Sequence, residues 1–183
     1  MRAITLARLL SRQIAEPELI LAHLNDELAT DNPSGMFVTF LCGVYDPGSG
    51  RLALANAGHC RPLLLPAGGT PPVWGVKDLG TALGFEQNLT FARTELTLQA
   101  GDTLIFYTDG VTEAFNTNEE CYGSERLLRD AASLTGELPK MVTAGLLERV
   151  RAFAGRARAA ATCRLRRLFG WRRARSRRVC RPC

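Results

Sequence analysis

The sequence predicts an α+β domain, in which strands in the middle of the chain are flanked by helices at both ends. Apolar residues recur with the helical period near the start of the chain and again in residues 124–134 and 138–153. Between these regions, segments rich in β-branched and aromatic residues alternate with turns that contain Gly or Pro. Strands and helices do not alternate regularly, so a parallel sheet built from βαβ units is not expected. With 183 residues, the chain is long enough for one domain with a buried core.

Two helices are expected before the first strand. In residues 1–15 the apolar residues share one helix face, which favours a core-facing amphipathic helix over a targeting segment. This stripe consists of Leu6, Leu9, Leu10 and Ile14. A second helix is predicted to begin near Pro17, which suits a first-turn position, and to place His23 on the surface. Its apolar stripe consists of Leu21, Leu24 and Leu28.

A β-hairpin and four further strands are expected next. Residues 36–45 and 51–57 are predicted to form the hairpin, because the turn-forming residues 46–50 lie between two strand-like segments. Shorter strands, which are apolar segments bounded by turn residues, are predicted at 61–65, 72–76 and 89–98. Residues 103–107 are almost continuously apolar, which indicates a strand buried on both faces.

Asp109 is the candidate residue for chemistry, because it closely follows the predicted buried strand and precedes Gly110. A carboxylate at the end of a buried strand must be solvated, hydrogen-bonded or matched by a cation. Gly110 allows a sharp turn or the close approach of a ligand. The dipeptide by itself fits a strand-ending Asx turn as well as a ligand site, so both interpretations stay open at this point.

Charge divides the chain into two parts. The net charge of +5 combines −7 over residues 1–150 with +12 over residues 151–183, which contain 12 Arg and no Lys, Asp or Glu. A basic tail of this kind can bind nucleic acid or anionic lipid. The same composition is also typical of translation out of frame, since a selected basic segment usually retains some Lys.

The six cysteines are scattered along the chain, and no secretory signal accompanies them. Arg8 and Arg12 interrupt the apolar run that such a signal would need. Reduced thiols and a cytoplasmic location are therefore expected. No apolar segment is long enough to cross a bilayer, so no membrane span is predicted.

Four sequence segments occur in a specific order. They are Met36-Phe-Val-Thr39 with Asp46-Pro-Gly-Ser-Gly-Arg51, then Ala55-Asn-Ala-Gly-His59 with Pro62-Leu-Leu64, then Gly80-Thr-Ala-Leu-Gly84, and finally residues 100–114 (AGDTLIFYTDGVTEA) with Tyr122-Gly-Ser-Glu-Arg-Leu127. Together they resemble the PPM-type serine/threonine phosphatases, specifically the bacterial branch named after stage II sporulation protein E. The resemblance extends from the start of the chain to about residue 153.

The resemblance implies an α-β-β-α sandwich, which here is partial and lacks the family's first strands and its last strand. It also implies two Mn²⁺ or Mg²⁺ ions held by aspartates, with a metal-bridging water that attacks phosphoserine or phosphothreonine. Hard divalent cations prefer oxygen ligands, and two of them can activate water and hold the phosphoryl oxygens. Asp109 matches the aspartate of the family's Asp-Gly motif, so it is expected to be a metal ligand and the catalytic residue.

The partner that the resemblance implies is a phosphorylated regulatory protein, such as an anti-sigma-factor antagonist. The expected role is thus signal transduction in bacterial sigma-factor regulation. Nucleic acid is expected as a partner only through the Arg-rich tail.

Four further residues are expected to support the site. Gly110 belongs to the Asp-Gly motif itself. His59 either contacts the substrate or is a hydrogen-bonded residue at a strand end, and the second interpretation is favoured because buried polar groups so often serve structure. Glu113 and Asn116 can bond their own loop or a water near the metals, or be merely solvated, and the sequence does not decide between these alternatives.

The chain departs from the family pattern at both ends. The family has an Asp-Val-Ser-Gly-His-Gly-like motif before the first helix and an Asp-Asp-x-Thr segment on its last strand, and neither occurs here. Two divalent cations bring four positive charges, of which Asp109 neutralises only one. We therefore expect residues 1–153 to form a partial phosphatase domain with weak or no activity, and residues 154–183 to be an Arg-rich tail that is disordered or out of frame. A non-catalytic phosphoprotein-docking module and a nucleic-acid binder acting through the tail remain as alternatives.

Overall fold

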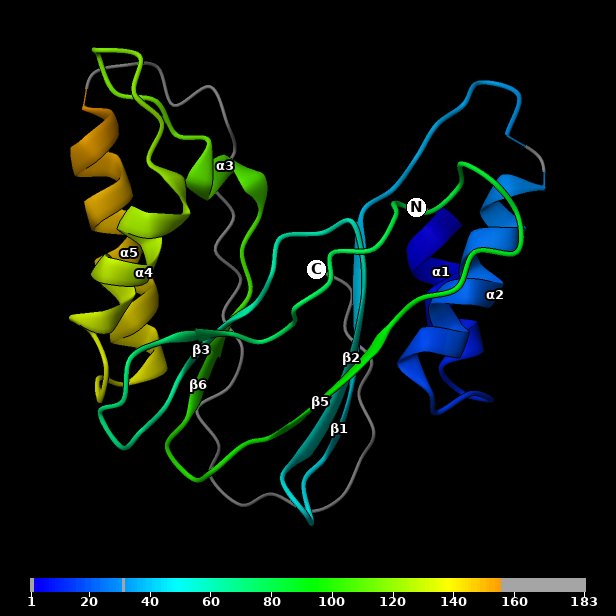
Figure 1. Cartoon of the computed structure of the whole chain (residues 1–183), viewed down its shortest axis with the longest axis horizontal. Helices are drawn as coiled ribbons and strands as arrows, with labels where there is room; N and C mark the ends of the chain where they lie inside the picture. The colour runs from blue at the N-terminus through cyan, green and yellow to red at the C-terminus, as the bar shows by residue number, and fades with distance from the viewer. Residues whose placement is uncertain (1, 31, 156–183) are drawn as a thin grey trace. The chain divides into compact units, whose positions relative to one another are not determined.

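The computed structural model describes residues 2–30 and 32–155, which contain α-helices and antiparallel strands (Figure 1). The predicted α+β class is confirmed. The described residues group into two compact units. The first contains those within Met1–Arg61 and Val76–Leu98, and the second those within Pro62–Gly75 and Gln99–Arg173. The Arg-rich tail lies outside the described residues from residue 156 onward.

A three-stranded antiparallel sheet, in the order β1-β2-β5, forms the centre of the first unit. The elements of this unit are α1 (Arg2–Leu10), α2 (Pro17–Ala29), β1 (Phe40–Asp46), β2 (Arg51–Ala57) and β5 (Arg93–Thr97). Strands β1 and β2 form the predicted hairpin, in which Asp46 pairs with Arg51. The Asp46 carboxylate closes the turn between them, because it accepts the N–H of Gly48 at 3.0 Å and the hydroxyl of Ser49 at 2.6 Å.

Strand β1 begins at Phe40, so the predicted strand is wrong over residues 36–39. The N–H and C=O of Met36 bond to the Asn32 side chain at 2.9 and 2.6 Å instead of to a neighbouring strand. Val38 pairs with Leu83 in an isolated bridge. A side chain thus takes the backbone hydrogen bonds that strand pairing would need.

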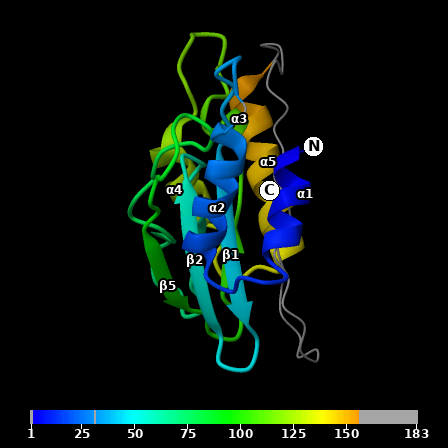
Figure 2. The same ribbon diagram turned by 90° about the vertical axis from the view of Figure 1, so that its right-hand side faces the viewer.

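Helices α1 and α2 pack against the sheet of the first unit (Figure 2). Pro17 occupies the first turn of α2, as predicted, and Leu21 and Leu24 are buried. His23 is exposed, also as predicted.

The apolar stripe of α1 differs in part from the prediction. Leu9 is 50% exposed, whereas Ala7 is buried at 1% exposure. Leu6, Leu10 and Ile14 are partly buried against the core. The core-facing side of α1 therefore includes Ala7 in place of Leu9.

A second antiparallel sheet, in the order β4-β3-β6, belongs to the second unit. The elements of this unit are β3 (Leu63–Leu65), β4 (Val73–Trp74), β6 (Thr103–Ile105), α3 (Asp109–Thr112), α4 (Gly123–Ala132) and α5 (Pro139–Ala154). Helices α4 and α5 lie side by side (Figure 1) and occur where the sequence predicted helices. They bury Leu127 from α4 and Val142 and Leu146 from α5.

The four shorter strands exist but are shorter than predicted. Residues 61–65, 72–76, 89–98 and 103–107 contain β3, β4, β5 and β6, respectively. Strand β3 begins only after Pro62, which has no N–H to donate to a neighbouring strand. Strand β6 is buried at each of its residues, as expected for a strand covered on both faces.

None of the helices in the described part of the chain has the length and apolar character needed to cross a bilayer. Of the described cysteines, Cys42, Cys60 and Cys121 form no disulfide. Cys163, Cys180 and Cys183 lie outside the described residues.

Candidate functional site

Asp109 is the first residue of α3, a helix of one turn that follows β6 after a short connection. Its side chain is exposed, and Oδ1 accepts the N–H of Gly110 at 2.8 Å. Its backbone carbonyl accepts the N–H of Glu113, also at 2.8 Å. The carboxylate is thus both exposed to solvent and hydrogen-bonded. Solvation and hydrogen bonding are two of the three arrangements that the sequence allowed, and a matching cation is the third.

Gly110 does not make the sharp turn that the sequence allowed. It is the second residue of α3, is buried, and is absent from the described glycines with positive φ. The chain enters a helix at this point, so of the two possibilities the close approach of a ligand stays open.

Asn116 organises the loop that follows α3. Its Oδ1 accepts the N–H groups of Asn118 and Glu120, both at 2.9 Å, and its Nδ2 donates to the Glu120 carboxylate at 2.8 Å. Of the alternatives left open by the sequence, these bonds favour support of the loop. Glu113 has an exposed side chain. Both residues belong, with Asp109, to the second unit.

His59 belongs to the first unit and follows the end of β2. The Asn56 side chain accepts the His59 N–H at 2.9 Å and donates to its C=O at 2.8 Å, and the His59 Nδ1 lies 3.2 Å from the Thr39 Oγ1. The preceding Gly58 donates its N–H to the carbonyl of Leu79 at 2.7 Å. These bonds fix the backbone of His59 and place its ring beside Thr39, and the choice between a structural and a substrate-contacting role stays a prediction.

Parts of three of the four sequence segments, residues 36–39, 55–59 and 80–84, meet at one end of β1 and β2 in the first unit. Gly80 has φ +67°, and a Cβ at this position would lie 2.3 Å from the carbonyl oxygen of Asn56. Leu83 exchanges two backbone hydrogen bonds with Val38, at 2.9 and 3.0 Å. Glycine is therefore required at position 80, because the left-handed backbone and the close approach both exclude a side chain.

The donor set for a metal ion is limited among the described residues. They contain no group of three or more His, Cys, Asp or Glu side chains arranged to hold a metal ion. The exposed Asp109 carboxylate is a hard oxygen donor of the kind that Mn²⁺ and Mg²⁺ prefer. A pair of divalent cations requires several such groups, so the described part of the chain does not fit the expected two-metal centre.

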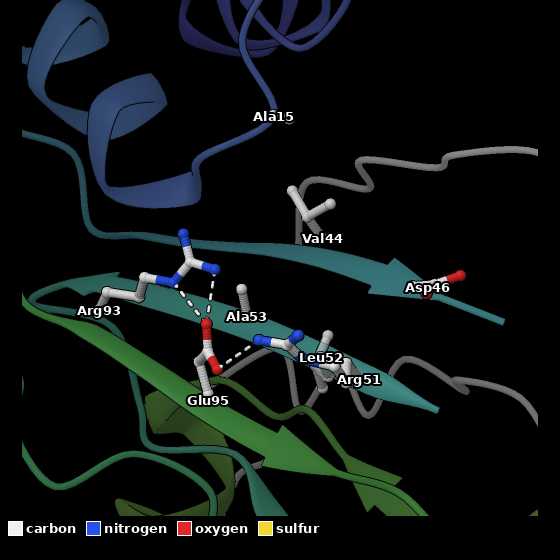
Figure 3. Close-up of a pocket in the computed structure, with 8 residues that line it drawn as sticks. All are labelled: Ala15, Val44, Asp46, Arg51, Leu52, Ala53, Arg93 and Glu95. Atoms are coloured by element: carbon white, nitrogen blue, oxygen red, sulfur yellow. Dashed lines mark hydrogen bonds and ion pairs between the residues drawn. The ribbon is translucent and has the colours of Figure 1, made fainter. Parts of the chain in front are cut away.

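A hollow of about 230 Å³ lies on the first unit (Figure 3). It is lined by Ala15, Val44, Asp46, Arg51, Leu52, Ala53, Arg93 and Glu95. The Glu95 carboxylate pairs with Arg51 at 2.8 Å and with Arg93 at 2.6 Å, and Arg93 also reaches Glu18 at 3.3 Å. Hydrogen bonds from Arg51 first and Arg93 second hold the pKa of Glu95 below its ordinary value. The hollow contains none of the predicted site residues.

Comparison with known families decides the relationship. Residues 1–160 match the sequence model of the stage II sporulation protein E (SpoIIE) family. The chain belongs to the SpoIIE family. The predicted resemblance to the PPM-type phosphatases of this branch is thereby confirmed.

This SpoIIE-family chain is similar in sequence to two bacterial proteins. Protein IcfG of Synechocystis is 38% identical over 105 residues, which cover 57% of this chain and 16% of IcfG. The phosphoserine phosphatase RsbU of Bacillus subtilis is 26% identical over 102 residues, which cover 56% of this chain and 30% of RsbU. The chain thus spans less than a third of either relative.

Solved structures share the fold. The RsbU and RsbW domains of Rv1364c from Mycobacterium tuberculosis match with a TM-score of 0.68 and 24% identity, over 84% of this chain and 42% of that one. The catalytic domain of the serine/threonine phosphatase PstP, in complex with two manganese ions, matches with a TM-score of 0.55 and 17% identity, over 87% and 76%. The SpoIIE-family chain therefore has a phosphatase-domain fold.

Sequence reasoning missed Asn25 and Asn32, two side chains that hold the segment 80–84 in place. Asn25 is completely buried in α2, where its Oδ1 accepts the N–H of Gly84 at 3.0 Å. Asn32 donates from Nδ2 to the Gly84 carbonyl at 2.9 Å. A signal was present, because Asn25 falls on the helical stripe defined by Leu21 and Leu28, where a buried residue is expected.

Proposed function

We propose that the chain is part of a metal-dependent protein serine/threonine phosphatase that hydrolyses phosphoserine or phosphothreonine on a regulatory partner protein, such as an anti-sigma-factor antagonist. Membership of the SpoIIE family supports this proposal. The similarity to RsbU, which is named a phosphoserine phosphatase, supports the class of substrate.

The structural observation that carries the proposal is the position of Asp109. Its exposed carboxylate closely follows the buried strand β6, so a hard oxygen donor is presented at the end of an element held by the core. In this proposal Asp109 is a ligand for Mn²⁺ or Mg²⁺ and the catalytic residue. Gly110, Glu113 and Asn116 shape the adjoining turn and loop, and His59 has a supporting role in the first unit.

We further propose that residues 1–183 alone have weak or no phosphatase activity. Affinity for hard cations depends on the number of carboxylates, and Asp109 supplies one negative charge against the four positive charges of two divalent cations. The described residues offer no cluster that would supply the remaining ligands.

The test is release of phosphate from a phosphoserine peptide by purified 1–183, with Mn²⁺ or Mg²⁺ titrated and metal binding followed by calorimetry. We expect turnover close to the background of the metal alone, and no saturable binding of two ions. Strong manganese-dependent turnover would contradict the proposal of weak activity. Binding of a phosphoprotein without metal or turnover would instead favour the non-catalytic docking module.

The role of Asp109 is tested separately with Asp109→Asn and, as a matched control, Asp78→Asn, since both carboxylates are exposed. We expect any residual manganese binding to fall in the Asp109 variant and to persist in the Asp78 variant. Equal binding by both variants would show that Asp109 is not a ligand.

A further inference from the structure

Two phenylalanine rings are stacked on the surface of the first unit. The ring centroids of Phe37 and Phe85 lie 5.1 Å apart at an interplanar angle of 16°, although the two residues are 57% and 59% exposed. Met36 and Val38, on either side of Phe37, are 73% and 36% exposed. We call these four residues the aromatic patch. Large apolar side chains that gather on a surface, rather than occurring singly, mark contact surfaces.

The backbone beneath the aromatic patch is fixed. The Asn32 side chain bonds both the N–H and the C=O of Met36, and it also bonds the C=O of Gly84, the residue before Phe85. The N–H of Gly84 is bonded by the buried Asn25. The backbone that carries both rings is therefore held in one arrangement, which lowers the entropic cost of binding a partner.

The segment that carries Phe85 lies against the C-terminal end of α2. The carboxylate of Asp26 accepts the N–H of Asn88 at 2.8 Å, and the hydroxyl of Thr30 accepts a hydrogen bond from the Gln87 side chain, also at 2.8 Å. The last turn of α2 contains no basic residue. The last carbonyl groups of a helix carry a partial negative charge, so this end of α2 favours a cation nearby.

Acidic side chains add to this negative charge. Residues 24–38 and 79–91, which carry the aromatic patch and its supports, contain two Asp, two Glu and no Lys or Arg. Among them, Glu27 on α2 and Glu86 beside Phe85 have exposed side chains. The surroundings of the aromatic patch therefore favour a partner with positive charge over an anionic one.

We propose that the aromatic patch docks a basic, amphipathic segment of a partner protein, in which apolar side chains are combined with Arg or Lys. Two properties of the first unit select this chemistry. The stacked rings offer apolar surface and aromatic faces, and the charge around them is negative. A second copy of the patch would bring like charges together, and an anionic lipid surface would meet the same repulsion. The proposal does not rest on the phosphatase function.

The apolar and charged parts of the segment have separate roles in the docking. Its apolar side chains cover the rings of Phe37 and Phe85, which removes apolar surface from water. Its cationic groups lie toward Glu27 and Glu86 and over the aromatic faces, where ion pairs and cation–π contacts are favourable. Docking therefore weakens as the salt concentration rises, because exposed charges are then screened.

The test measures the binding of labelled synthetic peptides to the full chain by fluorescence anisotropy. The probe is a peptide of Leu, Phe and Arg patterned as an amphipathic helix. One comparison peptide has Glu in place of Arg, and a second has Ser in place of Leu and Phe. We expect saturable binding of the probe and affinities at least about tenfold lower for both comparison peptides. A probe with a photoreactive phenylalanine should crosslink to residues 36–38 or to Phe85, as mapped by mass spectrometry.

Variants of the chain locate the binding. Phe37→Ser combined with Phe85→Ser should lower the affinity for the probe about tenfold or more, from the lost burial of two rings. Glu27→Gln combined with Glu86→Gln changes only exposed side chains, so it tests the patch even if the phenylalanine variant folds poorly. It should lower the affinity by about twofold to fivefold and weaken the salt dependence.

Matched controls change the same kinds of side chain in the second unit. Leu138→Ser with Met141→Ser removes two apolar side chains that are 71% and 52% exposed, and Glu125→Gln with Glu137→Gln removes two exposed carboxylates. Both pairs should leave the affinity unchanged.

Equal binding of the three peptides, absence of saturable binding, adducts only outside the aromatic patch, or an affinity unaffected by both pairs of patch substitutions would overturn the proposal. A dimer of the full chain that the double phenylalanine variant abolishes in sedimentation velocity would assign the patch to a second copy, and would overturn it as well.

Discussion

The side chain of Asn25 accepts the backbone N–H of Gly84 at 3.0 Å, across 59 residues of sequence. The same side chain donates from Nδ2 to the carbonyl of Glu86 at 2.8 Å. Helix α2 thereby fixes the backbone on both sides of Phe85. One buried amide thus connects the helix to the segment 80–84 and to the backbone that carries the exposed ring of Phe85.

Asn25→Ala should destabilise the protein by about 1–3 kcal/mol, because the Gly84 N–H would be left buried without its acceptor. Urea unfolding at neutral pH, followed by circular dichroism, measures this loss. Asn118→Ala is the control, since Asn118 is an exposed asparagine in a loop. Equal effects of the two substitutions would show that the Asn25 bonds contribute no specific stability.

Gly80→Ala should be more damaging than Gly35→Ala, although both glycines have a left-handed backbone, with φ of +67° and +60°. The backbone cost of about 1–2 kcal/mol is common to both substitutions. At Gly35 a Cβ would meet nothing within 4 Å, whereas at Gly80 it would lie 2.3 Å from the Asn56 carbonyl oxygen. Chemical denaturation of the two variants compares them directly, and similar unfolding free energies would contradict the close approach.

Glu95 should make stability depend on pH in the acidic range. Arg51 and Arg93 hold its pKa below the ordinary value of 4.5 in the folded protein. Because the folded pKa is the lower one, the stability that the ion pairs contribute is fully present above the unfolded value of 4.5. It is lost as the pH falls from there through the folded pKa. Thermal unfolding between about pH 3 and pH 7 should therefore show a smaller acid loss for Glu95→Gln than for the wild type.

The control for Glu95 is Glu125→Gln, which removes an exposed carboxylate on α4. This variant should lose as much stability at low pH as the wild type does. A Glu95→Gln profile identical to that of the wild type would mean that the ion pairs of Figure 3 do not contribute in solution.

Tyr122→Phe should cost about 1–2 kcal/mol, because it removes a part-buried hydrogen bond to Asp130. Burial first and the bond to Asp130 second raise the pKa of Tyr122 above its ordinary value of 10.0. The stability that the buried Tyr122 phenol contributes is present below pH 10. It is lost as the pH rises above 10, because the phenol then ionises in the unfolded state. The edge-to-face contact with Phe153, at 5.4 Å, is retained in the variant.

Denaturant unfolding and an ultraviolet titration of the phenols measure these two effects of Tyr122. Tyr45→Phe serves as a comparison, because Tyr45 is only partly buried. If Tyr122 ionises near its ordinary value of 10.0 in the folded protein, its burial against Asp130 is not maintained in solution.

Local sequence patterns predicted most of the fold. The turn after Asp46, the start of α2 at Pro17 and the burial of β6 each depend on neighbouring residues, so periodicity and turn chemistry were sufficient to find them. The strand predicted over residues 36–39 failed for the opposite reason. The hydrogen bonds of Met36 are taken by Asn32, and no propensity scale contains that competition.

The candidate site was predicted only in part. Asp109 could be singled out because it closely follows an apolar strand and precedes a glycine, a pattern visible in a single stretch of sequence. The assignment of Asn116 to its own loop could not be made, since an asparagine near a turn fits several bonding partners equally well. Its hydrogen-bond geometry distinguishes them.

The sequence by itself determined the α+β class and the membership of the SpoIIE family, because both depend on the kinds of residues and their order along the chain. Only the tertiary structure decided why Gly80 must be glycine, how Asn25 holds Gly84, and that Phe37 stacks on Phe85 at the surface. These relationships join residues far apart in the chain. Their energies depend on distances of a few ångströms, which are fixed only when the segments pack together.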